Sequence, residues 1–282
     1  FGFPATITFY LYWYRKDLRR PNIQARVGFL YDSYAVGSEF WEIHEIFLMD
    51  AITYVAAFII ILFIKYKPLV KNKIDEKSVF ERLKNGVNYL KENSLIFIFG
   101  VCSYMIFTFL IVEMFVLVPS YVSNYLNEGG NVFASSEVYY SIGAVLAGMS
   151  IHSLFQRWNT ILGIIILMIA TILGCLLLTY TKSTWIFYGI SLLIGVTNAG
   201  TRVLRITYLF NHVPNNIIGR SGSVFNSLSI VIRTAMISVF SMSFFMTGEN
   251  ARWGYMLGAI FIGIALIPLI LNYKRLIALE KN

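Results

Sequence analysis

The chain has 282 residues, of which 57% are hydrophobic, 16% aromatic and only 13% charged, and its mean hydropathy is +0.66. Soluble domains carry about 25% charged residues, so this composition argues against a soluble globular enzyme, and its richness in Ile, Leu, Val and Phe excludes a disordered chain. The net charge of +8 is more typical of basic cytoplasmic loops in a membrane protein than of nucleic-acid binding.

Long stretches without charged residues give the organisation of the chain. A helix that crosses the hydrocarbon core needs about 20 mostly apolar residues, and helices satisfy their own backbone hydrogen bonds in lipid. The predicted fold class is therefore all-α, a polytopic helical membrane protein in a lipid bilayer. The predicted spans are 47–65, 95–118, 133–154, 160–180, 184–208, 222–246 and 253–273.

The distribution of Lys and Arg predicts the orientation of these spans. The stretch 65–93 holds eight of them, whereas loop 119–132 holds none. Because cytoplasmic loops carry an excess of Lys and Arg, we place the linker 66–93 and the C-terminal tail 277–282 in the cytoplasm, at a plasma (inner) membrane. A capping box at 78–81 predicts an amphipathic helix in the linker.

Motifs for enzyme chemistry are absent from the sequence. It contains no phosphate-binding loop, no dinucleotide-binding glycine fingerprint and no His-Glu-x-x-His pair. Cys102 and Cys175 lie in apolar stretches and have no metal-ligand spacing. We therefore expect no enzyme activity, no cofactor, no metal and no nucleic-acid partner.

Several motifs occur in a characteristic order from about residue 47 onward. Residues 47–54, Phe-Leu-Met-Asp-Ala-Ile-Thr-Tyr, look like the start of a sixth helix, and residues 80–93 look like a central-loop helix. Gly143 and Gly148 resemble small residues that allow close helix packing. Residues 213–220, Val-Pro-Asn-Asn-Ile-Ile-Gly-Arg, resemble a loop between the tenth and eleventh helices. Together they resemble the C-terminal half of a major facilitator superfamily transporter, of the bacterial drug-exporter and siderophore-exporter-like branch.

This resemblance implies a six-helix transporter half over 94–276, built as two three-helix repeats and preceded by one extra span at 47–65. It implies secondary, proton-coupled export of a small amphipathic molecule of unknown identity. Substrate binds between two halves in such transporters, so the missing N-terminal half is an implied partner, and we expect an isolated half to be incomplete for transport. The residues that carry the structural motifs are Asp50, Gly143, Gly148, Pro214, Gly219 and Arg220.

The segment 1–46 is of another kind. Residues 15–20, Arg-Lys-Asp-Leu-Arg-Arg, and the stretches 24–34 and 40–42 resemble a juxtamembrane segment of protist channel-like proteins of the transient-receptor-potential and polycystin type. The two resemblances imply opposite orientations for span 47–65, so we expect a fusion near residues 43–48. A fragment of a channel-like multi-pass receptor is the alternative function, although the short loops after residue 94 offer no pore element. A non-transporting membrane-interaction protein is a third option.

Charged residues inside the spans are the first functional candidates, because charge in a bilayer is costly. Arg233 lies about 11 residues into span 222–246, roughly 16 Å deep. There it binds an anionic substrate group, pairs with a coupling carboxylate, or forms a structural ion pair. Glu113 is either a proton-coupling carboxylate or a solvated rim residue, and its depth argues against direct contact with Arg233.

Polar residues on span 184–208 form the second group of candidates. Asn198 and Thr201 contact either the substrate or a neighbouring helix through hydrogen bonds. Arg202 and Arg205 lie near the cytoplasmic end of this span. We interpret both as orientation anchors whose charged heads extend to the membrane surface.

Overall fold

The structure is a computed structural model that describes residues 43–64, 79–155 and 159–280. All regular structure within these ranges is helical, which confirms the predicted all-α class. Five helices in the described part are long and apolar enough to cross a membrane. The predictions for segment 1–46 and for the capping box at 78–81 fall wholly or partly outside the described residues.

The observed helices follow the predicted spans. α3 (Ile43–Phe63) corresponds to span 47–65, and α4 (Val79–Glu92) corresponds to the amphipathic linker helix. The other long helices are α5 (Ser94–Val112), α7 (Gly130–Phe155), α8 (Thr160–Tyr180), α9 (Thr184–His212), α10 (Ile218–Phe240) and α12 (Arg252–Leu271). Two short helices, α11 (Ser243–Met246) and α13 (Tyr273–Glu280), flank α12.

Two of the helices that correspond to predicted spans, α3 and α9, are not among the five candidate membrane helices. α9 has 29 residues but is not among the five, because polar residues occupy its second half. The apolar part of α3, Phe47–Phe63, is shorter than the candidate spans. α3 belongs to one compact unit of the chain and the helices from α4 onwards, apart from the first residues of α7, belong to a second.

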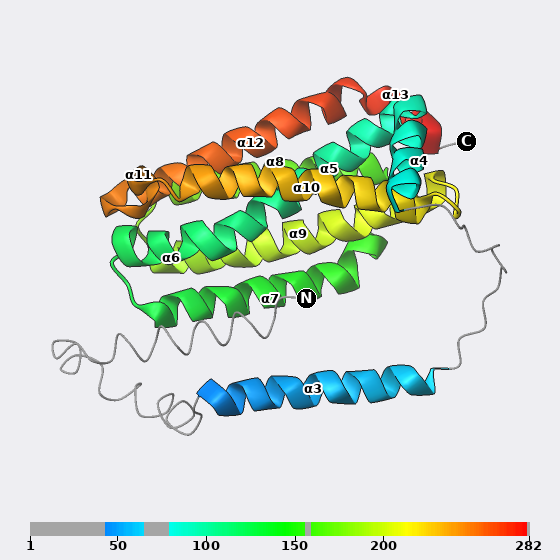
Figure 1. Ribbon diagram of the computed structural model, residues 1–282. Helices are drawn as coiled ribbons and strands as arrows, with labels where there is room; N and C mark the ends of the chain where they lie inside the picture. The colour runs from blue at the N-terminus through cyan, green and yellow to red at the C-terminus, as the bar shows by residue number, and fades with distance from the viewer. Residues whose placement is uncertain (1–42, 65–78, 156–158, 281–282) are drawn as a thin grey trace, which may run out of the picture. The chain divides into compact units, whose positions relative to one another are not determined.

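The second unit is an antiparallel helical bundle (Figure 1). α5 contacts α9, α10 and α12, and α8 packs against both α9 and α12. The core is aromatic and aliphatic, with Phe99, Phe109, Tyr208 and Ile262 at most 1% exposed. α5 is thus the helix around which the bundle is arranged.

The segment that follows α5 continues in the same direction with an altered backbone. Two π-helical stretches, Glu113–Leu117 and Tyr121–Tyr125, flank the short helix α6 (Val118–Ser120). Pro119 has no N–H to donate to the preceding turn, which accounts for an interruption of the regular hydrogen-bond ladder here. Together α5 and these stretches form one continuous helix, Ser94–Tyr125.

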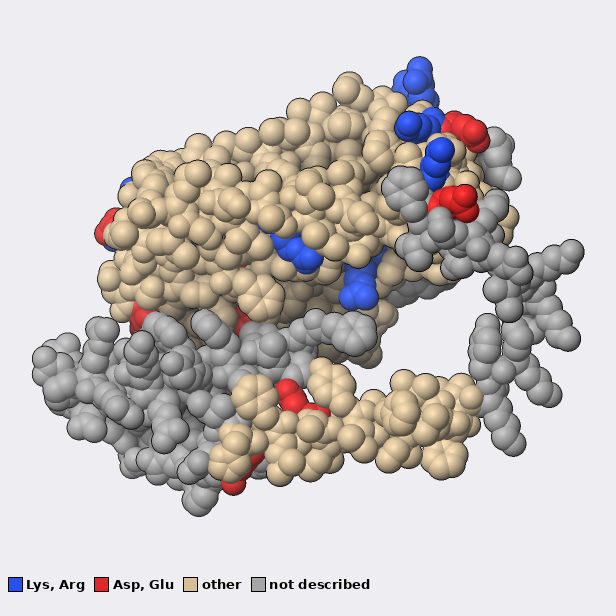
Figure 2. Space-filling model, viewed as in Figure 1, with Lys and Arg blue, Asp and Glu red and all other residues tan. Residues whose placement is uncertain are grey.

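One end of the bundle is formed by α4, α13 and the connection between α9 and α10, and we call it the basic end. Figure 2 shows Lys and Arg side chains gathered over α4 and α13 there. Three hydrogen bonds fix α13: Tyr208 Oη donates to the Leu276 carbonyl, His212 Nε2 contacts the Leu279 carbonyl at 3.1 Å, and the Thr160 N–H donates to Glu280 Oε1. We call the opposite end the distal end.

α7 and α9 cross at a point where both helices carry glycine. A Cβ at Gly143 would overlap the carbonyl oxygen of Leu192, and a Cβ at Gly195 would overlap that of Tyr140. The expectation of close packing therefore holds at Gly143, with Gly195 as its reciprocal partner. At Gly148 close packing is not found within the described part of the chain, because a Cβ there would meet none of its atoms within 4 Å.

We predict opposite effects of alanine at these glycines. Gly143→Ala and Gly195→Ala should each destabilise the bundle by about 1–3 kcal/mol, because the methyl group overlaps backbone and pushes the helices apart. Gly148→Ala should stabilise by about 0.5–1 kcal/mol, because glycine is unfavourable inside a helix. Thermal unfolding of the detergent-solubilised chain, followed by circular dichroism, measures both. Equal melting temperatures for the three variants would contradict the crossing.

Candidate functional site

A buried carboxylate lies in the distal half of the bundle. Glu113, the first residue of the π-helical stretch after α5, is only 7% exposed. The phenol of Tyr255 on α12 donates a hydrogen bond to Glu113 Oε1 at 2.9 Å, and Tyr255 is itself fully buried. Glu113 is therefore a buried, hydrogen-bonded group rather than a solvated rim residue.

Aromatic rings close the site around this pair. The ring of Tyr121 meets that of Tyr255 edge-on, with centroids 4.9 Å apart. Its hydroxyl donates to the carbonyl oxygens of Leu178 and Thr181, at 2.8 and 3.0 Å, so Tyr121 is held by the end of α8. π-helical turns frequently occur at functional sites, and here one presents Glu113 to α12.

A second carboxylate lies near enough to interact with the first. Glu137, on the distal part of α7, is partly buried and interacts electrostatically with Glu113. Glu137 was not among the predicted site residues, although its position four residues inside the predicted span 133–154 was a usable signal. Tyr255 was missed as well, because a tyrosine in an apolar span gives no signal of its partner.

Arg233 lies closer to the distal end than its predicted position at the centre of the membrane. α10 ends at Phe240, not at 246, because the chain turns at 241–242 and Phe245 packs against Phe240. Arg233 is thus seven residues, about 10 Å, from the end of its helix. α10 also contacts the π-helical stretch that starts at Glu113, so depth does not separate these two residues as expected.

No ion pair between them forms, however. Arg233 is partly exposed and has neither a hydrogen-bond nor an ion-pair partner among residues 43–64, 79–155 and 159–280. Asn226 lies seven residues earlier, on the same side of α10, is exposed, and is equally unpartnered within the described ranges. The hydroxyls of Ser223, Thr234 and Ser238 on this helix instead bond carbonyls of their own helix.

The two polar candidates on α9 have different surroundings. Asn198 Nδ2 donates a hydrogen bond to Tyr140 Oη on α7 at 2.6 Å. Of the two predicted roles of Asn198, this contact corresponds to the hydrogen bond with a neighbouring helix. Thr201 is 1% exposed, and its hydroxyl has no hydrogen-bond partner among the described residues. Of the two residues, Thr201 is therefore the one whose side chain still lacks a hydrogen bond that a bound molecule could supply.

The structure corrects the interpretation of Arg205 as a surface anchor. Arg202 is exposed, as expected for an anchor, whereas Arg205 is only 4% exposed. The Arg205 guanidinium lies over the Tyr104 ring at 3.8 Å from its centroid, and Nη1 donates to the Ser103 carbonyl at 3.0 Å. Arg205 faces inward because α5, which carries Ser103 and Tyr104, packs against that side of α9.

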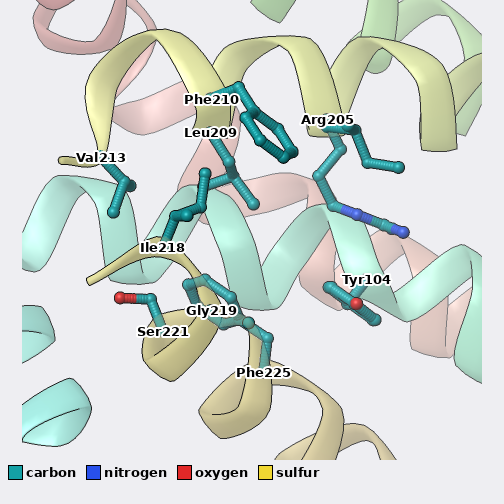
Figure 3. A pocket seen from close by; sticks show the side chains of 11 residues that line it. Tyr104, Arg205, Leu209, Phe210, Val213, Ile218, Gly219, Ser221 and Phe225 are labelled. Carbon is teal, nitrogen blue, oxygen red and sulfur yellow. The ribbon is translucent and has the colours of Figure 1, made fainter. Parts of the chain in front are cut away.

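A cavity of about 200 Å³ adjoins Arg205, between α5, α9 and α10. Figure 3 shows Arg205 above Tyr104 at one side and apolar side chains from α9 and α10 at the other. Gly219, a predicted motif residue, lines this cavity. Among the described residues, no group of three His, Cys, Asp or Glu side chains is placed to hold a metal ion.

The remaining motif residues have structural surroundings. The Pro214 carbonyl accepts hydrogen bonds from the N–H groups of Ile217 and Ile218, which shapes the turn before α10. A Cβ at Gly86 on α4 would lie 2.9 Å from the Arg220 carbonyl oxygen, so α4 packs tightly against this turn. The carbonyl of Asp50 on α3 accepts a hydrogen bond from the Thr53 hydroxyl.

An all-helical bundle with several apolar membrane spans and buried polar groups defines a multi-pass integral membrane protein. A family model described as Major Facilitator Superfamily matches residues 28–233, well over half of the chain. The chain therefore belongs to the major facilitator superfamily and is a membrane transporter protein. Comparisons with curated proteins and with solved structures find no match. Because the family match starts at residue 28, inside the segment 1–46, the fusion boundary near 43–48 stays a prediction.

We predict that Tyr255 and Glu113 are energetically coupled. Tyr255→Phe should destabilise the chain by about 1–3 kcal/mol, because the buried acceptor loses its donor. In a double-mutant cycle with Glu113→Ala, the coupling should be about 0.5–3 kcal/mol. Thermal unfolding in detergent measures each corner. Tyr180→Phe, at an exposed tyrosine on α8, is the control and should be additive with Glu113→Ala, and the same additivity for Tyr255→Phe would refute the coupling.

Proposed function

We propose that this chain is the C-terminal half of a secondary transporter that exports a small amphipathic molecule in exchange for protons, of the drug-exporter and siderophore-exporter-like kind. The basic end faces the cytoplasm, the membrane is the plasma membrane, and the chain has no enzymatic activity. An N-terminal half completes the translocation path, because substrates of this kind of transporter bind between two halves.

The face of α10 that carries Asn226 and Arg233 is the observation on which this proposal rests. Neither side chain has a partner in the described ranges, and they lie about 10 Å apart along one side of the helix. Serine and threonine hydroxyls can face lipid by bonding their own helix, but an unpaired arginine at this depth requires water or protein. We infer that this side of α10 faces the translocation path.

The exposed surfaces of α8 and α12 support the same assignment. The exposed large side chains of α8 and α12 are almost all aliphatic, as expected for contact with acyl chains. They include Ile166, Ile169, Leu173, Leu177, Leu257, Ile260, Ile264, Ile267, Ile270 and Leu271. A bundle with one aliphatic outer face and one face with unpaired polar side chains fits half of a transporter better than a complete lipid-surrounded protein.

Glu113 is the residue proposed to take up and release the proton. It is buried, it accepts a hydrogen bond from the neutral hydroxyl of Tyr255, and it forms no ion pair with a described residue. Hydroxyl donation suits both forms of the carboxyl group, since a protonated carboxyl still accepts through one oxygen. The channel-like alternative has no comparable support, because the family match does not favour it.

Cysteine accessibility tests the proposed path. In a chain whose two buried cysteines are replaced by Ala, Asn226→Cys and Arg233→Cys should react with a membrane-impermeant methanethiosulfonate reagent at least tenfold faster than Ile264→Cys, since a thiolate forms only in water. Mass spectrometry of the labelled chain in vesicles gives the rates.

Ile264 is a matched control, because it is exposed on α12 and lies about 18 Å from the distal end of its helix, between the depths of Arg233 and Asn226. If the three cysteines react at the same slow rate, α10 faces lipid and the proposed assignment of this face is wrong.

Substitution of the carboxylate tests proton coupling. In the transporter assembled with its N-terminal half, Glu113→Gln should abolish accumulation of ethidium driven by a pH gradient, because the amide cannot carry a proton. Equilibrium exchange of ethidium should remain, because the hydrogen bond from Tyr255 has an acceptor in either side chain. Inside-out vesicles allow both measurements, and accumulation that persists at the original rate would exclude Glu113 as the coupling group.

A further inference from the structure

The cavity beside Arg205 has one charged wall and several apolar ones. The guanidinium and the Tyr104 ring form the charged side, whereas Leu209, Phe210 and Phe225 contribute to the apolar sides. At about 200 Å³, it has the volume of roughly six or seven liquid water molecules at ~30 Å³ each. It is smaller than the ~300–1,000 Å³ typical of sites for drug-sized molecules, so it suits a compact ligand.

The charge of Arg205 is not neutralised by the described part of the chain. No carboxylate forms an ion pair with it in these ranges, and its neighbour Arg202 adds charge of the same sign. A guanidinium has five N–H donors, of which the Ser103 carbonyl takes one. A buried charge needs pairing and hydrogen bonds to be stable, so an anion beside Arg205 would supply what the protein does not.

A second polar group at the cavity is also unpartnered. Ser221, at the start of α10, lines the cavity and is 1% exposed, and its hydroxyl has no hydrogen-bond partner in the part of the chain that the structure describes. Buried hydroxyls normally have a partner, and each missing one costs about 1–3 kcal/mol. Figure 3 shows the Ser221 oxygen pointing away from Arg205, so Arg205 is the residue of this pair that can bind a charged group in the cavity.

The order of these groups along the bundle indicates which kind of anion fits. Arg205 lies seven residues, about 10 Å, before His212, the last residue of α9, whereas Phe210 and Val213 lie nearer the basic end. An anion at Arg205 thus has its apolar part directed toward the basic end. A phospholipid of the adjacent leaflet has the opposite polarity, with its headgroup at the membrane surface and its chains toward the centre.

We propose that the cavity between α5, α9 and α10 is a binding site for a small organic anion, a carboxylate on a short apolar body, with Arg205 as the residue that binds the carboxylate. This site is separate from the proposed translocation path, and it does not define the class of molecule that is transported. The site itself is independent of Asn226, Arg233 and Glu113.

Binding of radiolabelled octanoate tests the proposal. The purified chain in nanodiscs of phosphatidylcholine should bind octanoate saturably, and unlabelled octanoate should displace it, whereas octanol and octylamine at the same concentration should not. Arg205→Gln should weaken binding at least tenfold, because the amide is neutral and short. Arg202→Gln, an exposed arginine three residues away on the same helix, is the control and should change the affinity less than twofold.

A second variant covers the possibility that Arg205→Gln disturbs folding. Gly222 lines the cavity, and a Cβ there meets no described residue within 4 Å, so Gly222→Leu fills the cavity without displacing the described backbone. It should also weaken octanoate binding at least tenfold, while its melting temperature stays at or above that of the unaltered chain.

Several outcomes would overturn the proposal. These are equal displacement by octanol, equal loss in Arg202→Gln, undiminished binding in Gly222→Leu, or no saturable binding at all. If phosphatidylglycerol nanodiscs abolish octanoate binding, a lipid headgroup occupies the site and the proposal for a small free anion is wrong. None of these results alters the cysteine labelling of α10, so this site and the transport function can fail separately.

Discussion

Polar groups inside a membrane bundle must find a partner within the protein or in water, because lipid offers none. In this chain most side-chain hydroxyls meet that requirement within their own helix. Thr171, Thr179 and Ser191 each donate to the carbonyl four residues earlier. These hydroxyls therefore place no requirement on how the helices pack against one another. The groups that cannot satisfy themselves locally determine how the helices are arranged.

Cross-helix hydrogen bonds of this second kind join the helices that surround α5. Thr108 and Ser229 share a 2.7 Å hydrogen bond between α5 and α10, and Arg205 reaches the Ser103 carbonyl from α9. In a bilayer the hydrophobic effect does not drive helices together, so close packing and such bonds carry the association. The close glycine contact between α7 and α9 and the interhelical hydrogen bonds therefore have the same effect, because both hold helices together where the hydrophobic effect does not.

The span pattern is the part of the fold that the sequence predicts well, because twenty apolar residues between charges have few alternatives in a membrane. The span pattern does not show which side of each helix faces the interior of the bundle. Arg202 and Arg205 have the same residue type and nearly the same depth, yet one is exposed and the other buried. The difference of three positions rotates the side chain by roughly 300° around α9. The sequence does not show that α5 packs against the side of α9 on which Arg205 lies.

Arg205 and Arg233 show how far the bundle satisfies its own charges. Arg205 has a carbonyl and an aromatic face as partners, which compensate a guanidinium in part. Arg233 has neither in the described part of the chain, although its helix touches the segment of the buried carboxylate Glu113. A bundle selected to be complete in lipid would place such a charge against that carboxylate. Arg233 instead lies on a partly exposed side of α10, which is the side that we propose to face the translocation path.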